Sequence, residues 1–181
     1  MVSKKYISPD NLHEYSVQLA KSVLKDDFKP TWIIALWRGG CFPGSIVQGY
    51  LRHYGINSDH IAIRTSSYDT EGNQHIVKIY GLSYIVENIK NTDKILVVDD
   101  VFDSGRTIAA LINELKSKSR ANFPADPNDF RVATIFYKPD NNKTNIVPNY
   151  YFEETSDWLV FPHEFEDLTR EEIKEFMGID M

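Results

Sequence analysis

The sequence predicts an α/β fold, in which a largely parallel sheet is flanked by helices. Apolar runs of strand length at residues 31–37, 94–98 and 131–137 alternate with segments whose apolar residues recur at helical spacing. These runs are apolar without alternation, which is typical of strands that are covered on both faces. With 181 residues, of which 42% are hydrophobic, the chain is long enough for one such domain.

The first predicted elements are a helix, a buried strand and a second helix. Residues 8–10 (SPD) predict a helix start, because a capping hydroxyl, a proline and an acid in the first turn all favour an N-terminus. Residues 31–37 (TWIIALW) predict the buried strand. The next helix is expected over residues 43–54, and Gly55 is expected to close it as a C-terminal cap.

The middle of the chain predicts a hairpin and a further buried strand. Residues 60–65 (HIAIRT) predict a strand, and the polar stretch 66–74, which has no helical period, is interpreted as a loop. Residues 75–80 (HIVKIY) alternate in polarity, which predicts an edge strand of the hairpin. Residues 94–98 (KILVV) predict the next buried strand, which ends at two acids.

The last part of the chain predicts two helices and two strands. Apolar residues recur at helical spacing over residues 108–115. Residues 119–130 contain two prolines and several Asn and Asp residues, so we expect a surface insertion. Residues 131–137 (RVATIFY) predict a strand and residues 150–152 a shorter one. Residues 169–172 (TREE) form a capping box that opens a final short helix.

The predicted architecture also indicates where a ligand should bind. In open α/β sheets, ligands bind beyond the carboxyl ends of the strands, at the point where the strand order reverses. Functional residues are therefore expected directly after Trp37, Thr65, Val98 and Tyr137.

Composition and charge limit the classes of function. A net charge of -6 argues against a surface that binds nucleic acid mainly through phosphates. One cysteine excludes a disulfide framework and a cysteine-based zinc site, and it fits a reducing compartment. The first residues contain no apolar core of signal-peptide length, and no run approaches the roughly 18 apolar residues of a membrane span. We therefore expect a cytoplasmic protein.

The strongest functional signal lies in residues 94–107 (KILVVDDVFDSGRT). A buried strand delivers Asp99 and Asp100 at its end, and residues 103–107 supply an acid, two hydroxyls and a glycine directly before a helix. Glycine allows a tight turn, and a helix N-terminus offers unpaired N–H groups to a phosphate. The adjacent acids would repel a bare phosphate unless they bind sugar hydroxyls or a magnesium ion. The competing interpretation is a helix cap beside solvated loop acids.

Residues 94–107 closely resemble the phosphoribosyl-diphosphate signature of type I phosphoribosyltransferases. That signature is a hydrophobic strand, two acids, two apolar residues and then Asp-Ser/Thr-Gly-x-Thr. The resemblance extends over nearly the whole chain, and it is greatest to the short xanthine-guanine and hypoxanthine-guanine enzymes of microbes. Other segments resemble the pyrophosphate loop, the mobile hood loop, the purine-reading strand with its lysine, and the base-stacking segment of the 6-oxopurine branch: residues 35–40 with 42–44, 66–69, 133–139 and 157–164.

Each of these segments also has a simpler interpretation. Arg38 with its two glycines is compatible with a plain turn, Lys138 with an exposed strand end, and Trp158 with a core position. All of them follow predicted strands, at the sheet edge where a ligand is expected. Cys41 is interpreted as a small packing residue, because no histidine-plus-acid pattern accompanies it.

The resemblance implies the type I phosphoribosyltransferase fold with a small hood. It implies one domain over residues 1–181, with the hood contributed by the N-terminal and C-terminal segments. The implied activity is that of a purine-salvage glycosyltransferase (a pentosyltransferase). Such an enzyme transfers phosphoribose from 5-phosphoribosyl 1-diphosphate to guanine, hypoxanthine or xanthine and releases pyrophosphate. The resemblance also implies Mg²⁺ as cofactor and a homodimer or homotetramer, with neither nucleic acid nor membrane as a partner.

The same resemblance implies roles for individual residues. Asp103 is the expected catalytic proton acceptor. The expected metal ligands are Asp99, Asp100 and Glu164. The expected purine-binding residues are Lys138, Trp158, Leu159 and Val160. The expected residues that bind phosphoribosyl diphosphate are Arg38, Gly39, Gly40, Ser67, Tyr68, Asp99, Asp100, Asp103, Ser104, Gly105, Arg106 and Thr107.

Three other classes stay open at this point. A regulatory protein of the same fold would keep a pocket for phosphoribosyl diphosphate or a nucleotide, although the negative net charge counts against a role on DNA. A receiver-type phosphoacceptor domain would place acids at strand ends but would not need the Ser-Gly-x-Thr that follows them. A phosphoribosyltransferase for adenine, orotate or uracil would share the central signature without predicting Lys138. His163 departs from the resemblance, since tryptophan is the commoner residue there, so the choice among the three purines also stays open.

Overall fold

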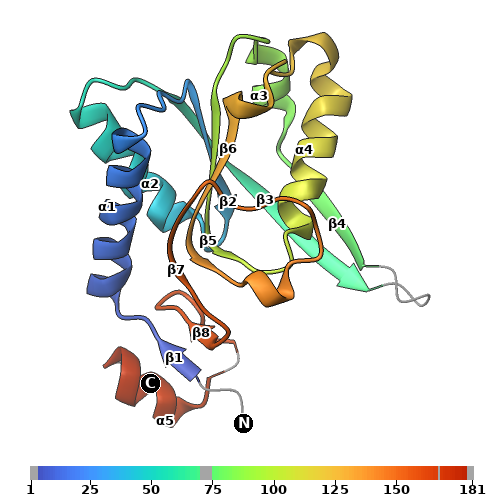
Figure 1. Cartoon of the computed structure of the whole chain (residues 1–181). Coiled ribbons are helices and arrows are strands. Elements are labelled where there is room, and N and C mark those ends of the chain that lie inside the picture. Colours follow the sequence, from blue (N-terminus) through green and yellow to red (C-terminus); the bar gives the residue numbers. More distant parts are fainter. Residues whose placement is uncertain (1–3, 70–74, 167, 179–181) are drawn as a thin grey trace.

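The computed structural model describes residues 4–69, 75–166 and 168–178, and its centre is a six-stranded sheet (Figure 1). From one edge to the other, the strand order is β4-β3-β2-β5-β6-β7. The strands are β2 (Trp32–Trp37), β3 (Asp59–Asp69), β4 (His75–Tyr80), β5 (Ile95–Phe102), β6 (Phe130–Tyr137) and β7 (Tyr150–Glu154). All neighbouring pairs are parallel except β3 and β4, which form an antiparallel hairpin. The predicted fold class is confirmed.

Helices cover both faces of this sheet (Figure 1). One face carries α1 (Pro9–Lys25) and α2 (Cys41–His53), and the other carries α3 (Ser83–Asn88) and α4 (Arg106–Ser119). The first helix begins as predicted, because the Ser8 hydroxyl accepts a hydrogen bond from the backbone N–H of Asn11 at 3.1 Å. None of the helices in the described ranges is long and apolar enough to cross a membrane.

Burial explains why the central strands are apolar on both sides. In β5, Leu96 and Val98 belong to the apolar cluster that includes α1 and α2, whereas Ile95 and Val97 belong to the cluster that includes α3 and α4. All four side chains are fully buried. Each such burial contributes about 1.5–3 kcal/mol, so both faces of the strand stabilise the layered arrangement.

The parallel register brings the carboxyl ends of the strands to one edge of the sheet. Ala35 of β2 lies opposite Val98 of β5, which in turn lies opposite Ala133 of β6. After β2 the chain adds β3 on one side and later β5 on the other, so the strand order reverses between β2 and β5. The loops that follow β2 and β5 therefore flank the position where sheets of this kind bind ligands.

A second, two-stranded sheet joins the two ends of the described chain (Figure 1). Here β1 (Lys4–Tyr6) pairs in parallel with β8 (Trp158–Val160). The helix α5 (Arg170–Met177) packs on this sheet, with the rings of Tyr6 and Phe176 stacked 3.6 Å apart. The predicted capping box at its start is confirmed, since Thr169 and Glu172 bond to each other's backbone N–H groups.

The prediction of a loop over residues 66–74 is wrong for residues 66–69. Residues 66–69 continue β3, where Ser66 lies opposite Lys78 and Ser67 opposite Val77. The ladder of backbone hydrogen bonds with β4 holds these residues, so the strand continues without an apolar run. The remainder of the predicted loop, residues 70–74, lies outside the described residues.

Several other boundaries differ from the prediction. β5 continues past Val98 to Phe102, because pairing with β6 persists through the two acids. α2 begins at Cys41 rather than at Pro43, which lies inside its first turn. The short elements β1, β8 and α3 were not predicted. The predicted surface insertion contains two short 3-10 turns, Arg120–Asn122 and Pro127–Asp129.

Candidate active site

Two half-buried carboxylates mark the end of β5. Asp99 accepts a hydrogen bond at Oδ1 from the backbone N–H of Asp100 at 3.0 Å, and Asp100 accepts one at Oδ1 from Val101 at 2.8 Å. Burial penalises the charged form of Asp99, and the neighbouring Asp100 repels it, so the pKa of Asp99 lies well above its usual value. The site therefore stores unfavourable negative charge that a cation would relieve.

The loop after β2 passes so close to the acid-bearing part of β5 that Gly39 and Gly40 have no room for a side chain. A Cβ on Gly39 would lie 1.9 Å from Oδ2 of Asp100, and a Cβ on Gly40 would lie 2.3 Å from the carbonyl oxygen of Val98. Arg38 precedes the two glycines after a cis peptide bond, and its side chain is half exposed. The three predicted diphosphate-binding residues of this loop therefore border the acids at the end of β5.

A second tight turn leads from β5 into α4. Gly105 has φ +73°, and a Cβ there would lie 2.5 Å from Oγ1 of Thr144 and 2.8 Å from the ring of Phe102. The N-cap residue Gly105 makes no side-chain cap hydrogen bond to α4, which begins at Arg106, and the N–H of Arg106 donates to the Ser104 hydroxyl at 3.4 Å. The N–H groups of a helix N-terminus, with a favourable helix dipole, are suited to a phosphate. The turn brings Ser104 and Thr107 to the same helix end, as the sequence predicts.

Lys138 lies beside Asp103, at the end of β6. Its Nζ atom is 3.8 Å from Oδ2 of Asp103, and its backbone N–H donates to the carbonyl oxygen of Phe102 at 2.9 Å. The lysine side chain is only 12% exposed, whereas that of Asp103 is 51% exposed. The interpretation of Lys138 as an exposed strand end is therefore wrong. The pairing places an ammonium group and a carboxylate next to one another at the edge of the site.

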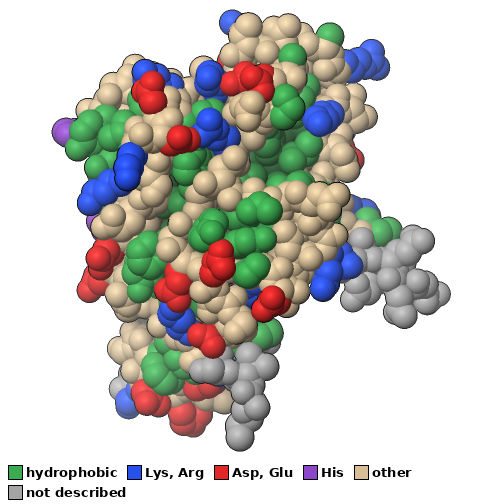
Figure 2. Space-filling view, viewed as in Figure 1, with side chains coloured by type: hydrophobic (Ala, Val, Ile, Leu, Met, Phe, Trp, Pro, Cys, Tyr) green, Lys and Arg blue, Asp and Glu red, His purple; other side chains and the backbone are tan. Residues whose placement is uncertain are grey.

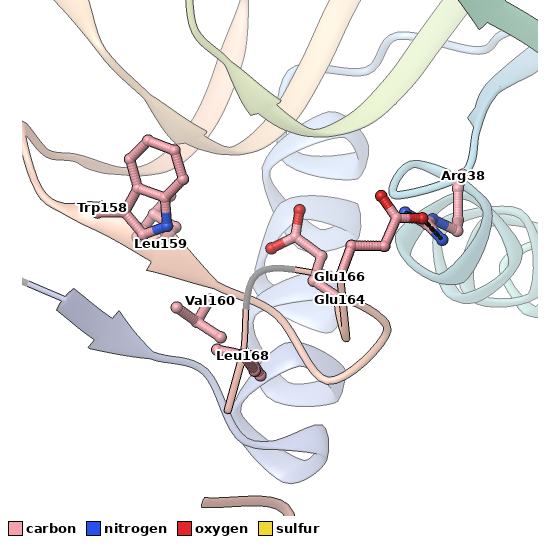
Figure 3. A pocket seen from close by; sticks show the side chains of 7 residues that line it. All are labelled: Arg38, Trp158, Leu159, Val160, Glu164, Glu166 and Leu168. Atoms are coloured by element: carbon pink, nitrogen blue, oxygen red, sulfur yellow. Dashed lines mark hydrogen bonds and ion pairs between the residues drawn. The ribbon is translucent and has the colours of Figure 1, made fainter. Parts of the chain in front are cut away.

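A pocket of about 90 Å³ runs from Arg38 to β8 (Figure 3). Its lining residues are Arg38, Trp158, Leu159, Val160, Glu164, Glu166 and Leu168. Trp158 is 52% exposed, so a core position for it is wrong, whereas Leu159 and Val160 are buried. The pocket thus joins a predicted diphosphate-binding residue to the predicted purine-binding segment.

The segment after β8 approaches the acids from the other side. His163 Nε2 lies 3.2 Å from Oδ2 of Asp100. Glu164 accepts a hydrogen bond at Oε2 from the backbone N–H of Phe161 at 3.2 Å, and burial raises its pKa above the usual value. Asp100 adds a smaller repulsion to Glu164, so all three predicted metal ligands share one electrostatic environment.

These carboxylates do not form a ready-made metal cage. Within the described ranges, no three His, Cys, Asp or Glu side chains are arranged as a metal-binding group. Mg²⁺ keeps several water ligands and is commonly held by one or two carboxylates together with substrate phosphates. Asp99 and Asp100 supply such an oxygen donor set with excess negative charge, so they fit Mg²⁺ that arrives with a phosphorylated substrate.

Not all predicted site residues come together. Ser67 and Tyr68 lie in β3, which β2 separates from β5, and the exposed Ser67 pairs with Val77 in the hairpin. Cys41 has its pKa raised by burial and by the two acids, which disfavours a thiolate and agrees with the packing role predicted for it.

Sequence reasoning missed two contacts of the site. The first is the contact of His163 with Asp100, and the second is the contact of Glu166 with Arg38. The only signal for them was the charged stretch 163–167 (HEFED) after the base-stacking segment, and no spacing rule links it to either partner.

Acidic and basic side chains are interspersed on the face of the molecule shown in Figure 2, so this face carries no broad field of one sign. The fold and the site together define an α/β protein whose charged and glycine-rich loops gather at the reversal point of its sheet.

Comparison with known proteins assigns this chain to a family. The phosphoribosyl transferase domain matches residues 10–170, and the chain belongs to that family. It is 26% identical over 191 residues to the hypoxanthine-guanine phosphoribosyltransferase of Schizosaccharomyces pombe, with 90% of each chain covered. It is 30% identical over 164 residues to the xanthine-guanine phosphoribosyltransferase of Desulfotalea psychrophila, covering 88% of this chain and 86% of that one.

A solved structure supports the same relationship. The purine phosphoribosyltransferase from Pyrococcus horikoshii superposes with a TM-score of 0.70 at 25% sequence identity, covering 92% of this chain and 97% of that one. The layered α/β fold thus agrees with that of a phosphoribosyltransferase over nearly the whole length of both chains.

Asp99→Asn is expected to stabilise the ligand-free protein at neutral pH. Because the pKa of Asp99 is raised on folding, the unfolded chain ionises more readily, and stability is lost as the pH rises toward the raised pKa. Asp99→Asn does not lose stability in this way. The difference in unfolding free energy between the variant and the wild type should therefore be smallest below the ordinary carboxyl pKa of about 3.9 and should grow as the pH rises above it. Thermal unfolding from acidic to neutral pH, with the half-exposed Asp103→Asn as control, measures this difference. Parallel pH profiles of the wild type and Asp99→Asn would contradict it.

Proposed function

We propose that the protein transfers phosphoribose from 5-phosphoribosyl 1-diphosphate to a 6-oxopurine, giving the nucleoside 5′-monophosphate and pyrophosphate. The names of the relatives support this proposal, since they act on hypoxanthine, xanthine or guanine. The observation that carries it is the placement of two acids between a glycine loop and a phosphate-binding turn at one sheet edge. The reaction belongs to purine salvage.

In the proposed complex, the substrate phosphates bind at the two tight turns. The N–H groups at the start of α4, with Ser104 and Thr107, hold the 5′-phosphate. Arg38 and the backbone around Gly39 and Gly40 hold the diphosphate, for which a guanidinium offers a planar set of donors. The 5′-phosphate and the diphosphate are attached at opposite ends of the ribose. The two turns lie on either side of the acids, which therefore face the ribose.

Asp99 and Asp100 would hold the ribose hydroxyls and Mg²⁺, with Glu164 as a further oxygen donor. When bound, Mg²⁺ supplies Lewis-acid stabilisation of the departing diphosphate. Binding it would also relieve the repulsion that raises the pKa of Asp99. The proposed metal role thus accounts for a pair of half-buried acids in which Asp99 costs stability in the free protein.

Asp103 is the proposed proton acceptor. Its side chain is half exposed, lies 3.8 Å from the ammonium group of Lys138 and follows β5 at the edge of the site, where a carboxylate can accept a proton as a general base. The acid takes the proton that leaves the purine ring nitrogen as the bond to the ribose forms. No covalent intermediate with the enzyme is needed.

The purine would lie between Lys138 and β8. Lys138 donates to the oxo group at position 6, the exposed ring of Trp158 stacks on the base, and Leu159 and Val160 line the pocket. Ser67 and Tyr68, in the β3–β4 hairpin, would reach this site only as part of a hood that covers it.

The small sheet of β1 and β8 with α5 is the proposed fixed part of that hood. It joins the N-terminal and C-terminal segments and carries the purine-binding residues, so we treat residues 1–181 as one domain. A hood of this kind excludes water from a reacting centre that water would otherwise attack.

A homodimer or homotetramer is the proposed assembly, and the cytoplasm the proposed location. Trp37 and Phe42 are 55% and 40% exposed beside the start of α2, and large exposed aromatics of this kind are enriched in protein interfaces. A single cysteine suits a reducing compartment. A nucleic acid or membrane partner is not part of the proposal.

One prediction of the proposed function concerns the choice of base. Guanine, hypoxanthine or xanthine should yield nucleotide, and adenine should be turned over negligibly, because its amino group would face the donors of Lys138. Sites built on such a bond discriminate by up to roughly 10⁴-fold. Nucleotide formation with Mg²⁺, phosphoribosyl diphosphate and each base measures this. Efficient adenine turnover would overturn the assignment, whereas binding of phosphoribosyl diphosphate without turnover of any base would favour a regulatory protein.

Two variants separate recognition from stacking. Lys138→Ala should erode the preference for 6-oxopurines, whereas Trp158→Ala should weaken all purines alike, because stacking is available to any purine. Steady-state kinetics with each base checks both expectations. A loss of preference in Trp158→Ala alone would reverse the two roles.

A further prediction concerns catalysis. Asp103→Asn should keep the fold but lower kcat by roughly 10²–10⁴-fold, the usual contribution of a general base. Asp140→Asn removes an exposed acid from the turn after β6 and serves as the control. Single-turnover measurements with saturating substrates report the chemical step. Unchanged rates in Asp103→Asn would exclude it as the proton acceptor.

A further inference from the structure

Residues 161–166, which we call the strap, contact both charged groups that the proposed function reserves for substrate. His163 contacts Asp100 across 3.2 Å, and Glu166 contacts both terminal nitrogens of Arg38 at 3.4 Å. The strap thus presents a basic partner to the acid and an acidic partner to the base. Figure 3 shows the side chain of Glu166 directed at Arg38 across the mouth of the pocket.

The strap is a folded turn and not a loose connection. The backbone N–H of Glu164 donates to the carbonyl oxygen of Phe161 at 3.0 Å, and the Glu164 side chain accepts from the N–H of Phe161 at 3.2 Å. Phe161 is buried and contacts the ring of Phe136 edge-on at 6.0 Å. The core therefore anchors the start of the turn.

The same anchor orients His163. Its ring stacks on Phe161 at 5.4 Å with an interplanar angle of 18°, which directs Nε2 toward Asp100. The side chains of His163 and Asp100 are 23% and 15% exposed, so the contact is largely shielded from water. A polar contact with a carboxylate is stronger where water is excluded than at an exposed position.

The position of this contact conflicts with substrate binding. Oδ2 of Asp100 contacts His163, and the same atom faces the loop after β2, where a Cβ on Gly39 would lie only 1.9 Å from it. In the proposed complex Asp100 would hold the cation, so the contact with His163 occupies a carboxylate oxygen that the cation would need. The guanidinium of Arg38 is likewise shared between Glu166 and the diphosphate.

We propose that two side chains of the strap, His163 and Glu166, close the empty site and must be displaced by phosphoribosyl diphosphate with Mg²⁺, while the anchored turn stays in place. The imidazole of His163 blocks the carboxylate of Asp100, and the carboxylate of Glu166 blocks the guanidinium of Arg38. This inference rests on the proposed function. It assigns His163 and Glu166 as residues that weaken substrate binding in the free protein, a role opposite to that of ligands.

The two contacts differ in strength. The Arg38–Glu166 pair is exposed, so its loss should tighten binding of the magnesium complex by no more than about 3-fold. The shielded His163 contact should matter more, and its loss should tighten binding by about 2- to 10-fold. His163 is therefore the residue to test first.

Four variants of the full chain test the contacts of the strap and separate them from packing and from net charge. His163→Phe keeps a ring on Phe161 but removes the donor, whereas His163→Gln keeps a donor and should behave like the wild type. Glu166→Gln removes the contact with Arg38 together with one negative charge. Glu171→Gln removes an exposed acid from α5 and is its control for the general effect of net charge on an anionic ligand. Isothermal titration with Mg²⁺ and phosphoribosyl diphosphate, without any base, gives the dissociation constants. Weaker or unchanged binding by His163→Phe would overturn the proposal.

Hydrogen exchange in the ligand-free protein gives a second readout that needs no substrate. The strap amides of His163→Phe should exchange faster than those of the wild type and of His163→Gln. Equal exchange in all three proteins would also overturn the proposal. If the wild type failed to bind phosphoribosyl diphosphate at all, the proposed function would fall, and the exchange result would still decide whether His163 closes the strap. Normal binding with no gain in His163→Phe would overturn the strap and leave the proposed function intact.

Discussion

The crowding of Asp99 and Asp100 at the end of β5 is the constraint on which the rest of the site depends. Two carboxylates withdrawn from water repel each other, and the raised pKa of Asp99 records that cost. The protein tolerates the cost because both faces of β5 are packed with fully buried aliphatic side chains. A stable strand thus holds two neighbouring acids at the point where the proposed function places a cation and a sugar.

The geometry around this pair leaves little freedom to the neighbouring loops. Gly39 and Gly40 are excluded from carrying a side chain by Asp100 and by the backbone of Val98, and Gly105 adopts a positive φ against Phe102. Alanine at Gly39 or Gly40 would push the loop away from β5, and alanine at Gly105 would collide with Phe102 and Thr144. The loops therefore take their shape from close contact with the sheet, so their precision derives from the rigidity of β5.

Much of this arrangement follows from the sequence, because long apolar runs and capping residues act locally. The helices α1, α2, α4 and α5, the central strands and the motif from Asp99 to Thr107 were predicted in the correct order. The errors fall where long-range pairing decides the structure. Residues 66–69 form a strand only because β4 lies beside them, and β1 exists only because β8 does. The contact of His163 with Asp100 joins distant segments, and no local pattern encodes it.

The pairing of β1 with β8 has a consequence for how the protein is made. Lys4 lies opposite Trp158, so β1 is synthesised long before the strand with which it pairs. Most of the apolar core lies between the layered sheet and its helices, although Leu159 and Phe161 also belong to it, so much of that sheet can form during synthesis, as domains generally do. Translation itself thus orders the assembly, since β1 and β8 can pair only after Val160 has left the ribosome.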